Sequence, residues 1–184
     1  MTILQIDSSI TGEVSVTRQL TAAIVDRLVQ ADPAATIIHR DLAAQPLPHL
    51  TLEDAADHTL VDEFLAANTV VIGAPMYNLS LPTQLKAWID RLLVPGRTFR
   101  YTAEGSPEGL ASGTRVIVAL ARGDFYAVGS PAAAVEHLET YLCAVFGLIG
   151  SMPQLVIADG TAIGPEQREK SVAAALNEIS LISA

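Results

Sequence analysis

The most informative segment for the fold is Thr69-Val70-Val71-Ile72-Gly73-Ala74-Pro75-Met76-Tyr77-Asn78, followed after two residues by Leu81-Pro82-Thr83-Gln84-Leu85-Lys86-Ala87-Trp88-Ile89-Asp90. The apolar run 69–73 predicts a buried parallel strand, and residues 81–90 predict a helix opened by proline. The loop 74–78 then follows the carboxyl end of that strand. Open parallel sheets bind their ligands at this edge, so the loop is the leading candidate for a ligand contact.

Around this stretch, short β-branched runs alternate with longer Ala- and Leu-rich segments, which is the pattern of βαβ units. We expect strands at residues 2–7, 36–40, 69–73, 115–120 and 154–157, and helices at residues 16–30, 62–67, 81–90, 132–146 and 165–182. Residues 95–113 carry many glycines and prolines and predict no regular element. The count predicts a single α/β domain over residues 1–184, a three-layer flavodoxin-like sandwich with a parallel sheet of order 2-1-3-4-5.

Composition narrows the function classes. A chain of 184 residues with 50% hydrophobic content suits one domain with a large core. The net charge of −9, carried by scattered acidic residues, argues against nucleic acid and anionic membranes and favours small-molecule partners. We expect a cytoplasmic protein, because Met1 leads directly into a strand without a signal peptide or membrane span, and the lone Cys143 permits no internal disulfide. The four histidines lack metal-ligand spacing, so no metal site is expected.

The loop after the first expected strand has the chemistry of a phosphate site. Ser9, Ser15 and Thr17 offer hydroxyls, while the start of the next helix offers free N–H groups and the positive end of its dipole. A helix cap is the simpler alternative role for Ser15, and both roles stay open. The chain contains neither G-x-x-x-x-G-K-[ST] nor G-x-G-x-x-G, which argues against P-loop nucleotide hydrolysis and a Rossmann dinucleotide fold.

A third loop, Ala121-Arg122-Gly123-Asp124-Phe125-Tyr126, follows the strand expected at 115–120. Backbone donors near Gly123 suit the carbonyls of a flat heterocycle, with an ordinary turn as the alternative. Arg122 either holds this loop or lies on the surface. Glu136 and Glu139 are expected on an exposed helical face.

Taken together, these loops resemble the FMN-dependent NADH-azoreductases, within the flavodoxin-like NAD(P)H quinone reductases. The resemblance rests on five landmarks in the family's order: Ser8-Ser9 with Ser15-Val16-Thr17, Ala74-Pro75-Met76-Tyr77-Asn78 with Thr83-Gln84-Leu85-Lys86, the run from Thr98-Phe99-Arg100-Tyr101-Thr102 to Leu110, Ala121-Arg122-Gly123, and Ala158-Asp159-Gly160. They cover nearly the whole chain. The Pro-Met-Tyr-Asn and Phe-Arg-Tyr-Thr segments are the specific ones.

The resemblance implies a tightly bound, non-covalent FMN. Its phosphate would lie on Ser9, Ser15, Val16 and Thr17, its ring along Pro75, Met76, Tyr77, Asn78 and Leu79, and its pyrimidine end at Ala121, Arg122, Gly123 and Asp124. Tyr101, contributed across a homodimer interface, would border the substrate pocket with Phe125, Tyr126 and Leu148. The family pattern has a second glycine at position 124, phenylalanine at 79 and often an aromatic at 148.

The implied activity is the two-electron reduction of quinones and aromatic azo compounds by NADH, with NADPH as a possible donor. The mechanism would be ping-pong with hydride transfer through FMN N5, so no side chain is assigned a catalytic proton transfer. The alternative is a flavodoxin-type electron carrier without NADH turnover. Residues 95–113 disfavour a carrier, which needs an exposed flavin edge. Leu85, Trp88, Ile89, Leu92 and Leu93 offer more apolar bulk than one core needs, which favours a homodimer.

Overall fold

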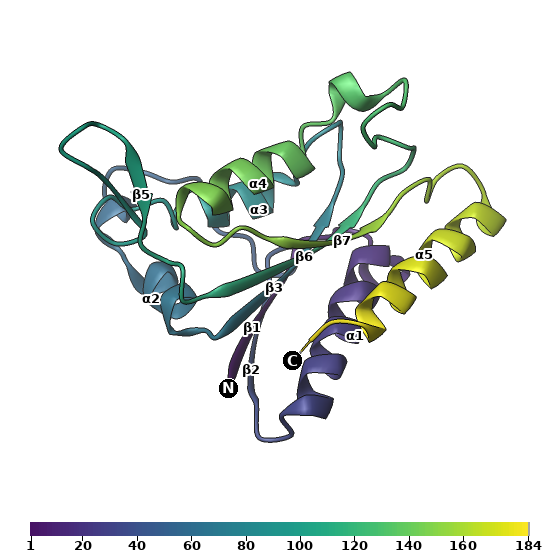
Figure 1. The fold of residues 1–184 in the computed structure, drawn as a ribbon, viewed down its shortest axis with the longest axis horizontal. Coiled ribbons are helices and arrows are strands. Elements are labelled where there is room, and N and C mark those ends of the chain that lie inside the picture. Colours follow the sequence, from purple (N-terminus) through teal and green to yellow (C-terminus); the bar gives the residue numbers. More distant parts are fainter. Residues whose placement is uncertain (184) are drawn as a thin grey trace.

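The computed structural model describes residues 1–183 and is built on a five-stranded parallel sheet (Figure 1). Its strands are β1 (Thr2–Asp7), β2 (Thr36–Asp41), β3 (Thr69–Pro75), β6 (Arg115–Ala121) and β7 (Gln154–Ala158). Their order is β2-β1-β3-β6-β7. Because β6 and β7 are the fourth and fifth strands of this sheet along the chain, the expected order 2-1-3-4-5 is confirmed.

Helices cover both faces of the sheet. The helices α1 (Val16–Ala31) and α5 (Pro165–Ser180) pack on one face, and α2 (Thr59–Ala66), α3 (Thr83–Ile89) and α4 (Glu139–Leu148) pack on the other (Figure 1). Side chains alternate along a strand, so β3 sends Val71 toward α1 and α5 but Val70 and Ile72 toward the other three helices. Every residue of β3 is buried, as expected for the centre of a parallel sheet.

The register of the central strands brings three loops to one edge. Asp7 at the end of β1 pairs with Gly73, and Pro75 at the end of β3 pairs with Ala121 at the end of β6. One further hydrogen bond continues this pairing, because the Met76 N–H donates to the Ala121 carbonyl at 2.8 Å. The loops that follow β1, β3 and β6 therefore start side by side.

The prediction that residues 95–113 form no regular element is wrong. They contain a short antiparallel hairpin of β4 (Phe99–Tyr101) and β5 (Pro107–Gly109). Its turn places Gly105 at a φ of +81°, a backbone conformation that L side chains rarely adopt. Gly109 lies directly against the backbone of Gly150, where even a Cβ atom would come within 2.2 Å of the Gly150 nitrogen. The glycines and prolines thus serve a tightly docked hairpin with three-residue strands.

The prediction of a helix over residues 132–146 is also wrong for the first half of that range. A single 3₁₀ turn, Ala133–Val135, is followed by Glu136 in an extended conformation, and α4 begins only at Glu139. The Glu136 carboxylate accepts hydrogen bonds from the N–H groups of Leu138, Glu139 and Thr140 at 2.8 to 3.1 Å. The N–H groups at the start of a helix have no acceptor within the helix, and a carboxylate that accepts their hydrogen bonds stabilises a helix start at that point. The Glu136 side chain therefore caps α4.

The apolar helix after the main loop belongs to the core of its own chain. Leu85, Trp88, Ile89 and Leu92 are at most 1% exposed, so they provide no surface for a second subunit. The Trp88 ring packs edge-on against the Phe64 ring of α2, with the ring centroids 6.2 Å apart. The expectation that these four side chains offer spare apolar bulk to a dimer is therefore wrong, whereas Leu93, the fifth residue expected there, is half-buried. Among residues 1–183, no helix has the length and apolar content needed to cross a membrane.

Candidate functional site

A cavity of about 300 Å³ opens at the carboxyl edge of the sheet, between the loops that follow β1, β3 and β6. Its lining comes from those loops, from the first turn of α1 and from the segment around the start of α5. The lining residues are Ser9, Thr11, Val14, Ser15, Val16, Thr17, Pro75, Met76, Tyr77, Ala121, Gly123, Thr161, Ala162 and Arg168. We call this space the edge cavity.

The start of α1 supplies the donors of the edge cavity. Ser15 is the N-cap of α1, and its Oγ accepts the Arg18 N–H at 3.2 Å, so the capping role is confirmed. The same Oγ lies 3.1 Å from the Thr17 hydroxyl, and both side chains are buried. The N–H groups of Val16 and Thr17 belong to the first turn and have no acceptor within the helix. These N–H groups and hydroxyls suit a phosphate, and the positive end of the helix dipole adds to them.

Hydrogen bonds tie the first loop to the loop after β3. The Ser9 hydroxyl lies 3.0 Å from the Thr11 hydroxyl and 3.2 Å from the Tyr77 hydroxyl, which also receives the Ile10 N–H at 3.2 Å. Below them, the Ser8 hydroxyl donates to the Gly73 carbonyl at 2.6 Å. The two loops are therefore fixed relative to each other across the wall of the edge cavity.

The loop after β3 ends in a strained two-residue turn. Tyr77 and Ser80 exchange backbone hydrogen bonds at 2.9 and 3.1 Å, and the residues between them, Asn78 and Leu79, have φ values of 49° and 72°. Asparagine tolerates this region, but leucine rarely enters it, and such strain concentrates at binding and catalytic sites. Both side chains are exposed and lie outside the lining of the edge cavity.

Arg122 faces away from the edge cavity. Its side chain is 1% exposed, and it donates from Nε and Nη2 to both Asp159 oxygens at 2.5 and 2.9 Å and from Nη1 to Glu139 at 2.8 Å. Glu136 lies 3.6 Å from Nη1. We call these four residues the Arg122 cluster. The expectation of an exposed face is wrong for Glu136, which is 7% exposed, and Glu139 is only partly exposed.

Charge and hydrogen bonding favour the ionised forms of Arg122 and Glu136. Burial alone would lower the pKa of Arg122, but the hydrogen bonds and charges of Asp159 and Glu139 outweigh it and raise that pKa. Burial likewise opposes the charged form of Glu136, yet the N–H groups at the start of α4 hold its pKa below the usual range. The cluster joins the loop after β6 to the end of β7 and the start of α4, so Arg122 holds the loop by its side chain.

The remaining residues expected near the flavin or a substrate lie outside the lining of the edge cavity. Tyr126 has its ring 6.0 Å from the Arg122 guanidinium and lines a separate cavity of about 340 Å³ with the Arg122 cluster. Phe125 and Tyr101 are exposed, at 44% and 66%, and Leu148 is half-buried at the end of α4. Asp124 is exposed, and its carboxylate accepts the Phe125 N–H at 2.8 Å. None of these five lines the edge cavity within this chain.

The sequence interpretation missed five lining residues: Thr11, Val14, Thr161, Ala162 and Arg168. Thr161 and Ala162 follow β7, so applying the carboxyl-edge rule to the fifth strand would have found them. Arg168 lies on α5, and only the packing of α5 against α1 brings it to the site. Its Nη2 donates to the Val14 carbonyl at 2.7 Å.

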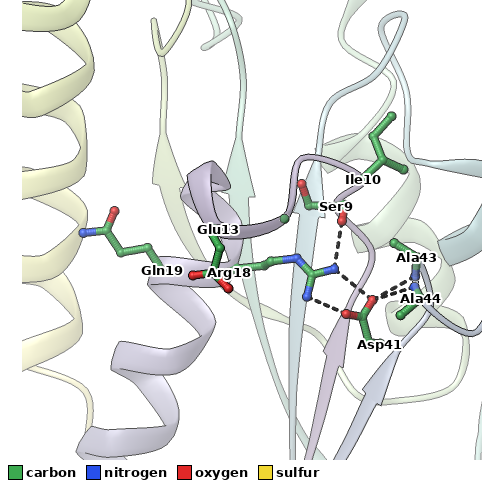
Figure 2. A pocket seen from close by; sticks show the side chains of 9 residues that line it. Ser9, Ile10, Glu13, Arg18, Gln19, Asp41, Ala43 and Ala44 are labelled. Atoms are coloured by element: carbon green, nitrogen blue, oxygen red, sulfur yellow. Dashed lines mark hydrogen bonds and ion pairs between the residues drawn. The ribbon is translucent and has the colours of Figure 1, made fainter.

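A second, larger cavity of about 560 Å³ lies on the other side of the first loop, toward the end of β2. Figure 2 shows the Arg18 guanidinium reaching across it to Asp41, and the two form a two-pronged ion pair at 2.7 and 2.8 Å. Arg18 also donates to the Ser9 carbonyl at 2.9 Å, while Asp41 accepts the N–H groups of Ala43 and Ala44. This network fastens the back of the first loop to the end of β2. The hydrogen bond from Arg18 holds the pKa of Asp41 at about 2.

The sheet order, the two helical layers and a cavity with hydroxyl donors at the carboxyl edge define a flavodoxin-like α/β protein. A protein-family model described as "Flavodoxin-like fold" matches residues 1–181. The chain is 50% identical to "FMN-dependent NADH:quinone oxidoreductase 2" of Bradyrhizobium diazoefficiens, over 100% of both chains. It is 50% identical to "FMN-dependent NADH:quinone oxidoreductase" of Xanthomonas campestris pv. campestris, over 99% of both.

Among solved structures, the azoreductase from Bacillus anthracis str. Sterne superposes with a TM-score of 0.88 at 28% identity, covering 98% of this chain and 97% of that one. The chain belongs to the flavodoxin-like family of FMN-dependent NADH:quinone oxidoreductases and azoreductases.

Proposed function

We propose that this protein is an FMN-dependent NADH:quinone oxidoreductase that also reduces aromatic azo compounds. The observation that carries the proposal is the edge cavity, in which the free N–H groups of α1 and the hydroxyls of Ser9, Ser15 and Thr17 meet the loop after β3. Relatives that are half identical over the full chain bear the corresponding name. These relatives also favour the enzyme over the flavodoxin-type electron carrier.

The residues of the edge cavity fit FMN. Ser9, Ser15 and the N–H groups of Val16 and Thr17 would hold the phosphate, because hydroxyls and a helix start together satisfy its oxygens. Pro75–Leu79 would border the ring, although Asn78 and Leu79 can do so only from the rim. Ala121–Asp124 would meet the pyrimidine end through backbone groups, since the Arg122 side chain is committed to its cluster.

When bound, FMN supplies the redox chemistry, taking two electrons from NADH and passing them to a quinone or azo compound. The residues of the chain would bind FMN, orient it and shield it from water. NADH, or NADPH in its place, and the acceptor would use one site in turn, as a ping-pong mechanism requires. The hydrogen bonds of Ser8 with Gly73 and of Ser9 with Tyr77 hold the walls of that site in place.

We further propose that residues 1–184 act as one FMN-binding domain in a cytoplasmic homodimer. Tyr101 supports the dimer, because it is 66% exposed on the β4–β5 hairpin and touches no part of its own edge cavity. In a dimer, this ring would border the substrate space of the partner subunit with Phe125, Tyr126 and Leu148. Light scattering should give twice the mass of 19.4 kDa, and an active monomer would contradict this placement of Tyr101.

A steady-state assay tests the function. Protein loaded with FMN should oxidise NADH continuously with benzoquinone or methyl red as acceptor, well above an equal concentration of free FMN. A protein that takes up FMN but does not accelerate NADH oxidation would support the electron carrier. A protein that takes up no FMN would overturn both readings.

A further inference from the structure

Among the residues that the structure describes, Arg168 is the only charged one that lines the edge cavity. The other lining side chains are apolar, hydroxyl-bearing or absent, and the first loop supplies no lysine. A phosphate monoester carries nearly two negative charges at neutral pH, and neutral donors and a helix dipole offset only part of them. The charge of the site therefore depends on a residue from α5, far along the sequence from the first loop.

The position of Arg168 is fixed by two elements. It is the fourth residue of α5, and its backbone N–H bonds to the Gly164 carbonyl at 2.9 Å. Its side chain is half-buried and crosses to the first loop, where Nη2 donates to the Val14 carbonyl, next to the Ser15 cap. A guanidinium has five N–H donors, so the contact with Val14 leaves others for an anion. This contact holds the charge beside the start of α1 before any ligand arrives.

Arg18 does not take this role, although it is closer in sequence. Its guanidinium lines the second cavity, behind the first loop, and both of its Nη atoms bond to Asp41. The Asp41 carboxylate neutralises that charge locally. Arg168 is thus the arginine whose charge is directed at the edge cavity.

We propose that Arg168 is the specificity-determining residue that makes this site prefer a flavin carrying a terminal phosphate over unphosphorylated riboflavin. The inference rests on the proposed FMN site and adds to it the residue whose positive charge pairs with the phosphate. In this role the arginine completes the cradle formed by Ser9, Ser15 and Thr17. It explains how a phosphate loop without a lysine binds a dianion.

Titration of flavin-free protein with FMN and with riboflavin tests the proposal, with flavin fluorescence as the readout. Arg168→Gln should weaken FMN binding roughly tenfold, the size expected for one charge-assisted contact in a half-buried position. Riboflavin binding should stay within about twofold, and Arg168→Lys should recover part of the loss. The variant should also flatten the salt dependence of FMN binding, since one charge pair is removed.

Lys170→Gln is the matched control, because it removes the same charge from an exposed position two residues further along α5, outside the cavity lining. It should leave both affinities unchanged. Equal losses of FMN and riboflavin in Arg168→Gln would overturn the inference, since they would show that Arg168 only fastens α5 to Val14. Unchanged FMN binding in that variant would overturn it as well. If the unsubstituted protein binds neither flavin, the proposed function falls together with this inference.

Discussion

Replacing Arg122 with methionine would remove the one cation of the Arg122 cluster and keep most of its volume. The structure sets the magnitude: three carboxylates remain, with side-chain exposures of 7% for Glu136, 16% for Asp159 and 36% for Glu139. Removing one partner from a buried ion pair costs about 3–5 kcal/mol. We expect the lower end, about 3 kcal/mol, because Glu139 reaches water and Glu136 keeps its bonds to α4.

Urea unfolding followed by circular dichroism measures this loss, in flavin-free protein so that binding does not add to stability. For a domain of this size, the same loss lowers the melting temperature by roughly 6–12 °C. Arg97→Met is the control, because the Arg97–Asp62 pair is exposed at 37% and 62% and should contribute less than about 1 kcal/mol. Adding Asp159→Asn to Arg122→Met should recover part of the loss. If Arg122→Met is no more destabilising than Arg97→Met, the buried network does not hold the loop.

Two further predictions concern the hairpin and the first loop. Gly109→Ala should destabilise the protein by about 2 kcal/mol or more in thermal unfolding, because its Cβ would overlap the Gly150 backbone, whereas Gly113→Ala, with open space around it, should stay within about 0.5 kcal/mol. Equal effects would contradict the close docking. The pKa of Asp41 is about 2, against 3.8 without its partners. This difference adds about 2 kcal/mol to the free energy of unfolding above pH 4, and the contribution is lost as the pH falls toward 2. Arg18→Gln should remove most of this contribution, so its stability deficit should shrink over that pH range; a constant deficit would refute the assignment.

Much of the fold is readable from local pattern. The strand at residues 2–7 and the helix from Val16 appear as expected, because a short apolar run and a serine cap specify them within a few residues. The expectations failed where a distant partner decides the conformation. The 95–113 hairpin depends on docking against Gly150, and the late start of α4 depends on a carboxylate that bonds back to the helix.

The candidate site divides in the same way. Nine of the residues expected to contact the cofactor do line the edge cavity: Ser9, Ser15, Val16, Thr17, Pro75, Met76, Tyr77, Ala121 and Gly123. They follow the three strands whose ends any sheet of this order must bring together. Arg122 does not line it, because its buried side chain pairs with carboxylates that lie 14 to 37 residues away in sequence. Ion pairs between residues this far apart cannot be predicted from the local sequence pattern.

The βαβ order, the ligand edge and the family follow from the amino-acid sequence, because periodicity, capping residues and short loop motifs act over a few neighbouring residues. The positions of the charges follow only from the way the elements pack. This packing makes Arg122 the buried core of an ion-pair cluster, and it brings Arg168 from the last helix to the first loop. Charge placement depends on which elements pack together, since Coulomb attraction acts through space and has no period along the chain.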